Sequence, residues 1–181
     1  MQITKDHMKG IEGLHANFAE KMAEYYSEIQ EVVIDVNIAF VDITTFAEFT
    51  QSLSNPTASY TFTIEPFAGG VIFDYSVQVL DAFVVHALGS KTEGPLSAEE
   101  RSVMGKIITR NLADLEGIWE PVESIRVSDA ELETNPAHIG LAKPGETVLL
   151  IAFEINAPAH SGLIRICYPY STLESVLPKL G

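Results

Sequence analysis

Two stretches of the sequence repeat one order of features, and this repetition limits the folds that the chain can adopt. Residues 71–83 and residues 161–177 both read as a buried strand, an aromatic turn and a short helix. In the second copy the run Leu163–Tyr168 is apolar except for Arg165, which is typical of a strand covered on both faces. Pro169 ends this strand, because proline has no N–H to donate. The repetition predicts a chain built from two related halves.

The features between these stretches also occur twice and in the same order. They are a long amphipathic helix (residues 11–31 and 97–119), an alternating strand (33–43 and 122–131), an Asn-Pro break, a hairpin and a short helix. We therefore expect a single α/β domain over residues 1–181. Its halves span approximately residues 11–87 and 97–178 and are joined by a loop at residues 88–96. The expected fold is a three-layer α/β/α sandwich with a pseudo-twofold internal repeat and a largely antiparallel sheet.

Capping boxes predict where three of the helices begin. In this motif a Ser or Thr and a Glu three residues later satisfy the free N–H groups of the first helical turn. The pairs are Thr45 with Glu48, Ser97 with Glu100, and Ser171 with Glu174.

Charge and composition exclude several classes of protein. The chain has 25 acidic and 11 basic residues, a net charge of −14, and its bases are scattered, so nucleic acid is not an expected partner. No apolar run approaches the roughly 20 residues that span a bilayer, and no signal sequence is visible, so we expect no membrane insertion and a cytoplasmic location.

The single cysteine, Cys167, lies in an apolar strand and is expected to be buried. Glutamates on one face of residues 11–31 form either a solvated face or an acidic strip that meets a basic partner.

The motifs of common enzymes and metal sites do not occur in the chain. It has no P-loop, no dinucleotide fingerprint, no H-E-x-x-H and no G-x-S-x-G. Its five histidines are never three to five residues apart, so neither a metal nor a cofactor is expected. Nothing in the spacing brings Cys167 and His160 together as a nucleophile and base. The residues favour an interaction module over an enzyme.

The longest polar stretch containing glycine lies between the two halves. Gly89 and Gly94 flank a lysine at its tip, Lys91, and Pro95 closes the stretch. This composition predicts an exposed loop, and exposed loops often carry binding functions.

Several motifs taken in order resemble the middle domain of the flagellar motor switch protein FliM, within the CheC-like superfamily. They are F-A-E-F and S-L-S-N-P at residues 46–56, V-I-F-D at 71–74, L-S-A-E-E-R at 96–101, W-E-P-V at 119–122, N-P at 135–136 and I-R-I-C-Y-P-Y-S-T-L-E at 164–174. The resemblance covers nearly the whole chain. It implies a non-enzymatic scaffold of the cytoplasmic switch ring, at the basal body, that binds FliG and neighbouring copies of itself.

The resemblance also implies the binding residues. FliG contact in the family runs through a Gly-Gly-x-Gly loop, which corresponds to Leu88, Gly89, Ser90, Lys91 and Gly94 here. Only Gly89 matches clearly, because serine occupies the second glycine position and Gly94 is shifted; this puts the loop conformation in question. The family's CheY-binding peptide is not recognisable in residues 1–10 and its FliN-like domain does not follow Gly181, so any link to CheY or FliN is expected to be indirect.

Two other functions remain open at this point. CheC-like relatives include phosphatases of phosphorylated CheY that use a Glu-x-x-Asn pair, but no asparagine here has an acidic residue three positions before it. The other alternative is a CheC-like module that binds a different partner, which the altered loop would suit.

Overall fold

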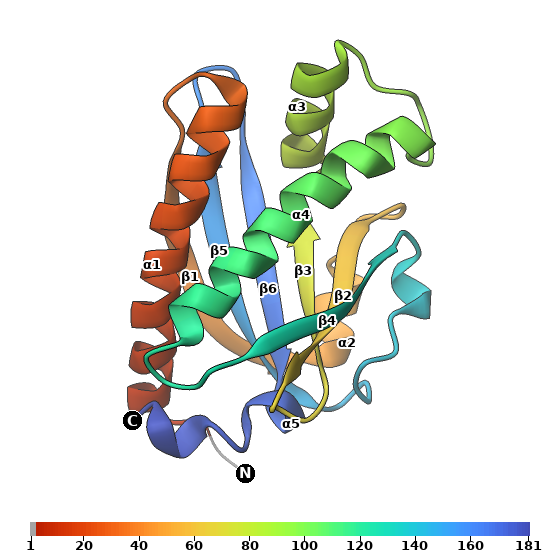
Figure 1. Ribbon diagram of the computed structural model, residues 1–181. Coiled ribbons are helices and arrows are strands. Elements are labelled where there is room, and N and C mark those ends of the chain that lie inside the picture. The colour runs from red at the N-terminus through yellow and green to blue at the C-terminus, as the bar shows by residue number, and fades with distance from the viewer. Residues whose placement is uncertain (1–2) are drawn as a thin grey trace.

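A six-stranded sheet runs through the centre of the computed structural model, which describes residues 3–181 (Figure 1). The strand order is β1-β5-β6-β3-β2-β4, and each neighbouring pair is antiparallel. The strands are β1 (Asp35–Thr45), β2 (Ala58–Glu65), β3 (Gly70–Tyr75), β4 (Arg126–Glu133), β5 (Thr147–Asn156) and β6 (Ser161–Pro169).

The strand order is symmetric between the two halves. Exchanging β1 with β4, β2 with β5 and β3 with β6 reverses the order and so leaves the sheet unchanged. Each half supplies one hairpin, β2–β3 or β5–β6, and its remaining strand pairs with the hairpin of the other half. The β3–β6 pair joins the halves at the centre, where Asp74 faces Arg165. The predicted pseudo-twofold repeat and antiparallel sheet are confirmed.

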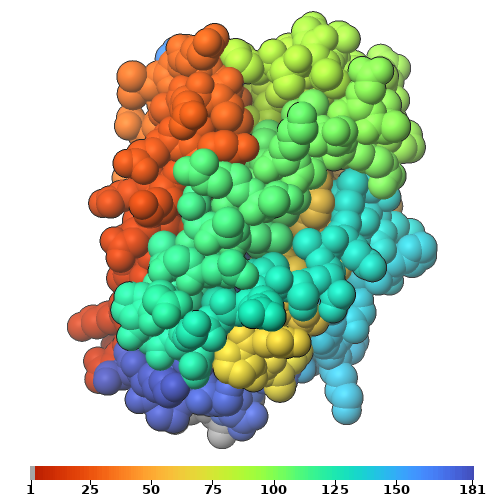
Figure 2. Space-filling model, in the orientation of Figure 1, coloured from red at the N-terminus to blue at the C-terminus, as the bar shows by residue number. Residues whose placement is uncertain are grey.

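The two faces of the sheet carry helical layers of unequal size. The long helices α1 (Lys5–Gln30) and α4 (Ala98–Trp119), with α3 (Val77–Leu88), pack against one face. Figure 2 views the molecule from this side, where α1 and α4 cover much of the sheet. The other face is covered by α2 (Phe46–Gln51) and the segment that contains Ile139. Cys167 is fully buried on this second face, as expected, and burial raises the pKa of its thiol.

Buried hydrogen bonds fix both long helices to the sheet. His15 of α1 and the Trp119 indole of α4 both bond to the Tyr168 hydroxyl of β6, at 2.8 and 3.1 Å. Burial lowers the pKa of His15 to about 4, so the imidazole is neutral at pH 7. The hydroxyls of Tyr26 and Tyr75 each donate to Asn111 Oδ1 at 2.7 Å. These bonds tie α1, α4 and the central strands into one core.

Two of the three predicted helix starts are confirmed and one is wrong. Thr45 caps α2, accepting a hydrogen bond from the Glu48 N–H, and Ser97 with Glu100 forms a complete capping box at α4. Ser171 caps nothing, because its hydroxyl donates to the carboxylate of Glu146 at 2.7 Å. The helix there, α5 (Tyr170–Leu173), has only four residues and starts directly after Pro169. Single turns of 3₁₀ helix lie at Pro136–His138 and Leu177–Lys179.

Two element boundaries also differ from the sequence prediction. Helix α1 begins at Lys5 and not at residue 11, because Thr4 and His7 form a capping box that the sequence pattern did not reveal. Strand β4 begins at Arg126 and not at residue 122. The N–H groups of residues 122 and 123 bond back to the Trp119 carbonyl at 2.9 Å, which continues the turn at the end of α4.

A buried ion pair holds the two halves together at the centre of the sheet. Arg165 of β6 lies 3.0 Å from Asp74 of β3, and the two side chains are only 16% and 6% exposed. Thr57 and Ser59 also donate to the Asp74 carboxylate, at 3.1 and 3.0 Å. The Arg165 guanidinium additionally lies 5.2 Å from the centre of the Phe49 ring. This cluster links β2, β3, β6 and α2.

Removing the arginine is expected to destabilise the protein strongly. Arg165→Met leaves the Asp74 carboxylate buried without its counter-charge, a change that typically costs about 3–5 kcal/mol. Urea unfolding followed by circular dichroism measures the difference. The matched control is Lys179→Met, which removes an ion pair with Glu123 whose lysine is 53% exposed; the expected loss there is below about 1 kcal/mol. Similar losses in the two variants would contradict the role given to the central pair.

Candidate functional site

The loop between the two halves connects α3 to α4 and lies at one end of the molecule (Figure 1). Leu88 ends α3 and is 39% exposed, and Gly89, Ser90 and Gly94 are also exposed. The predicted exposure of the loop is confirmed for these four residues.

Two glycines set the path of the loop. Gly89 caps the C-terminus of α3 with a φ of 83°, and its N–H donates to the Val85 carbonyl at 2.7 Å. Gly94 has a φ of 80°. Residues with a side chain rarely adopt such positive φ angles, so glycine is favoured at both positions. Ser90 occupies the position of the second glycine in the family pattern. It is not among the described residues with positive φ, so the loop conformation does not require glycine there.

Glu100 of α4 fastens the far side of the loop. One carboxylate oxygen accepts from the Thr92 hydroxyl at 2.6 Å and the Ser97 N–H at 2.8 Å, and the other accepts from the Thr92 N–H at 2.7 Å. These hydrogen bonds, the one from the Ser97 N–H first, lower the pKa of Glu100 to about 2. The sequence identified Glu100 only as a capping residue; its bonds to Thr92 depend on the fold of the loop and had no sequence signal.

Lys91 does not project from the tip of the loop, contrary to the sequence prediction. Its side chain is 19% exposed, and the ammonium group lies 3.8 Å from Asp81 of α3. The same group donates to the Thr92 carbonyl at 3.1 Å. The lysine folds back because the acidic side chain of α3 attracts it, whereas Ser90, Thr92 and Glu93 of the loop are exposed. Asp81 was not among the predicted site residues.

The space beneath the loop does not suit a small-molecule ligand. A hollow lined by Lys91, Gly94, Pro95 and Tyr75, among others, measures about 70 Å³, far below the several hundred Å³ typical of ligand sites. The loop presents an ordered surface, which fits contact with another macromolecule.

The residues considered for catalysis are not arranged for it. Asn111 is fully buried and its Oδ1 accepts from two tyrosines, so it cannot position an attacking water at the surface. Cys167 lies in the core beneath α2, whereas His160 lies in the β5–β6 turn beside Gln30 of α1. Within residues 3–181, no group of three or more His, Cys, Asp or Glu side chains is placed to hold a metal ion.

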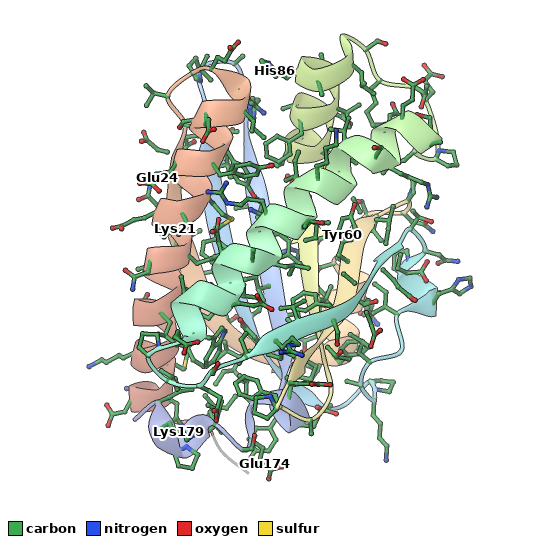
Figure 3. All side chains as sticks on the ribbon, in the orientation of Figure 1. Lys21, Glu24, Tyr60, His86, Glu174 and Lys179 are labelled. Atoms are coloured by element: carbon green, nitrogen blue, oxygen red, sulfur yellow. The ribbon has the colours of Figure 1, made fainter. Side chains whose placement is uncertain are left out.

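The acidic face of α1 is exposed along its length. Figure 3 shows Lys21 and Glu24 on the outer side of this helix. The predicted glutamates are all exposed: Glu12, Glu20, Glu24, Glu28 and Glu31. Across the described part of the chain, no helix is both long enough and apolar enough to cross a membrane.

Solved structures of low sequence identity share this fold. The crystal structure of the FliM middle domain from H. pylori is 22% identical, with a TM-score of 0.87 and coverage of 98% of this chain and 99% of that one. A chain in the crystal structure of the FliG–FliM complex from H. pylori is also 22% identical, with a TM-score of 0.91 and coverage of 97% of this chain and 100% of that one. A CheC-like superfamily protein from Shewanella is 11% identical, with a TM-score of 0.57 and coverage of 92% and 99%.

Sequence comparison agrees with the structural likeness. The flagellar motor switch protein FliM of Borreliella burgdorferi is 28% identical over 186 residues, which cover 99% of this chain and 53% of that protein. This chain thus spans about half the length of the curated relatives it matches. The family model described as flagellar motor switch protein FliM matches residues 4–181. The chain belongs to the FliM family of flagellar motor switch proteins.

Proposed function

We propose that this chain is a scaffold domain of the flagellar motor switch, which binds FliG through the loop at residues 88–96 and catalyses no reaction. Membership of the FliM family supports the role in the motor switch. The FliG–FliM complex of a structural relative supports FliG as the partner. A location at the cytoplasmic face of the flagellar basal body follows from the same role.

The observation that carries the proposal is the way the loop is held. Gly89 fixes its start as the helix cap, and Glu100 fixes Thr92 through both carboxylate oxygens. A loop held in one conformation loses little conformational entropy when a partner binds, which favours affinity. Because Ser90 needs no positive φ, the serine is compatible with this conformation.

A scaffold also needs contacts between copies, and we include side-by-side self-association in the proposal. Strand β1 lies at one edge of the sheet, next to β5 alone. Its side chains Phe40 and Ile43 are 44% and 37% exposed. An exposed strand edge with apolar side chains favours association with another chain.

Changing the second positive-φ glycine is expected to weaken FliG binding. Gly94→Val forces the backbone out of its φ of 80°, because a β-branched residue is strained there. We expect the FliG affinity to fall about tenfold, a loss of about 1.4 kcal/mol, while the protein stays folded. Isothermal calorimetry with FliG measures this, and circular dichroism checks the fold. The control is Ser90→Gly, which should bind FliG as tightly as the unchanged protein. A folded Gly94→Val variant with normal affinity would place the FliG contact elsewhere.

The anchor at Glu100 predicts a specific dependence of stability on pH. The pKa of this carboxyl is about 2 in the folded protein against an ordinary value of 4.5. Its contribution to stability is therefore complete above pH 4.5 and is lost as the pH falls towards 2. Glu100→Gln should unfold at a lower urea concentration than the unchanged protein at pH 7. The difference between the urea midpoints of the two proteins should become smaller as the pH falls from 4.5 towards 2. A difference that does not change with pH would contradict the role given to the Glu100 carboxylate.

A further inference from the structure

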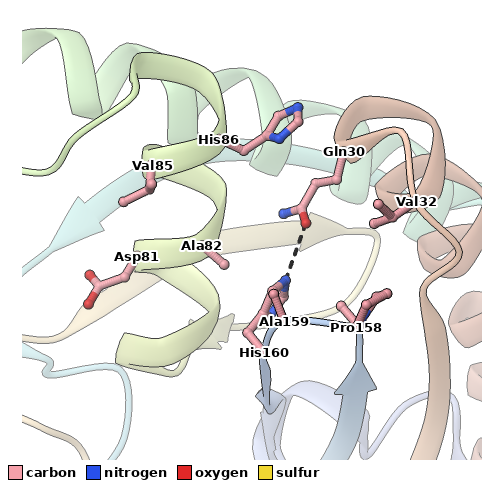
Figure 4. Close-up of a pocket in the computed structure, with 10 residues that line it drawn as sticks. Gln30, Val32, Asp81, Ala82, Val85, His86, Pro158, Ala159 and His160 are labelled. Atoms are coloured by element: carbon pink, nitrogen blue, oxygen red, sulfur yellow. Dashed lines mark hydrogen bonds between the residues drawn. The ribbon is translucent and has the colours of Figure 1, made fainter.

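A hollow of about 480 Å³ opens between the C-terminal end of α1, helix α3 and the β5–β6 turn (Figure 4). We call it the α1–α3 hollow. Its lining is mainly apolar, and two of its valines, Val32 and Val85, are 42% and 44% exposed. Ala82 of α3 and Pro158 of the turn belong to the same lining. A smaller hollow of about 190 Å³ shares Gln30 and His86 with it, so the surface depression continues along α1 and α3.

Four polar side chains, Gln30, Asp81, His86 and His160, belong to the otherwise apolar lining, and two of them are in contact. Gln30, the last residue of α1, is 8% exposed, and its carbonyl oxygen lies 3.2 Å from Nε2 of His160 in the β5–β6 turn. In Figure 4 the Gln30 amide reaches down from α1 to His160, opposite Ala82 and Val85. Because a carbonyl oxygen only accepts, His160 Nε2 carries the proton of this hydrogen bond. Burial lowers the pKa of His160, which keeps the ring neutral at pH 7.

This pair leaves one donor and one acceptor without partners. Gln30 Nε2 and His160 Nδ1 are buried and make no hydrogen bond. A buried polar atom without a partner is unfavourable, so both atoms favour an occupant that can bond to them. Rotating the Gln30 amide by 180° exchanges the roles of the two residues but still leaves one donor and one acceptor unmatched. The terminal torsion of glutamine is soft, so the amide can turn towards an entering group.

We propose that the α1–α3 hollow binds an extended peptide segment of a partner protein, with an apolar side chain in the hollow and its backbone N–H and C=O bonded to Gln30 and His160. A residue in an extended strand presents both groups on the same side, as it does in antiparallel pairing. This arrangement matches the unpaired donor and acceptor. The continuation of the hollow along α1 and α3 provides room for more than one residue.

The charges around the hollow determine which charged residues the bound peptide can carry beside its apolar residue. Asp81 is part of the lining and pairs with Lys91 of the loop at 3.8 Å, and the exposed Glu31 follows Gln30 directly. Lys106 is a basic residue in the lining of the smaller hollow. The whole chain carries a net charge of −14. A segment with Lys or Arg beside its apolar residues is therefore attracted, and an acidic one is repelled. The inference goes beyond the proposed function and does not depend on FliG.

A blocked pentapeptide tests the proposal directly. The probe is acetyl-Lys-Val-Leu-Val-Lys-amide, titrated into the isotope-labelled protein while NMR follows the side-chain NH₂ signal of Gln30. We expect this signal to shift, with a Kd below about 1 mM. Methylating the leucine nitrogen of the peptide removes its N–H and should weaken binding about tenfold. The corresponding peptide with glutamates in place of lysines should bind more weakly.

Two variants and one control connect the binding to the hollow. Ala82→Trp fills the hollow and should abolish binding, and Gln30→Met should weaken it about tenfold by removing the amide. Ala113→Trp is the control, because Ala113 lines a separate depression between α4 and β4. Unchanged binding in a folded Ala82→Trp variant would overturn the proposal. Equal affinity for propanamide would also overturn it, since the site would then recognise a small amide and not a peptide.

Discussion

The pairing of β3 with β6 is the constraint on which the rest of the structure depends. Among residues 3–181 it is the only strand pairing between the two hairpins, and each hairpin receives its outer strand from the other half. Neither half can therefore complete its part of the sheet alone. The buried contact between Asp74 and Arg165 lies within this pairing, so the halves are joined by backbone hydrogen bonds and by charge. A buried ion pair with several hydrogen bonds also specifies one register, since a shift of one residue would turn each charge to the opposite face.

The position of the candidate binding loop follows from this arrangement. The chain must leave the first half after α3 and enter the second through α4, so the connection lies at one end of the sheet. Both ends of the connection are fastened by features of the flanking helices, Gly89 as the cap of α3 and Glu100 in the first turn of α4. The loop is thus held in place as part of the scaffold, and Lys91 turns back to Asp81 instead of projecting from it.

Helix α3 brings the two candidate surfaces close together. It ends at the loop, and its side chains Ala82 and Val85 line the α1–α3 hollow. Asp81 belongs to that lining and also pairs with Lys91 of the loop. Asp81 therefore lies where the two surfaces meet.

The sequence by itself determined the duplicated pattern, the two long helices, the capping boxes at Thr45 and Ser97 and the place of the loop, because these depend on periodicity and local hydrogen bonding. Local signals failed where a distant residue competes for the same group. Ser171 looked like a helix cap, but Glu146, 25 residues away, takes its hydroxyl. The tertiary structure alone decided that Lys91 is covered, that Glu100 fastens the loop and that Gln30 meets His160 across 130 residues of sequence. Such contacts arise only after the halves pack together, so no spacing in the sequence could specify them.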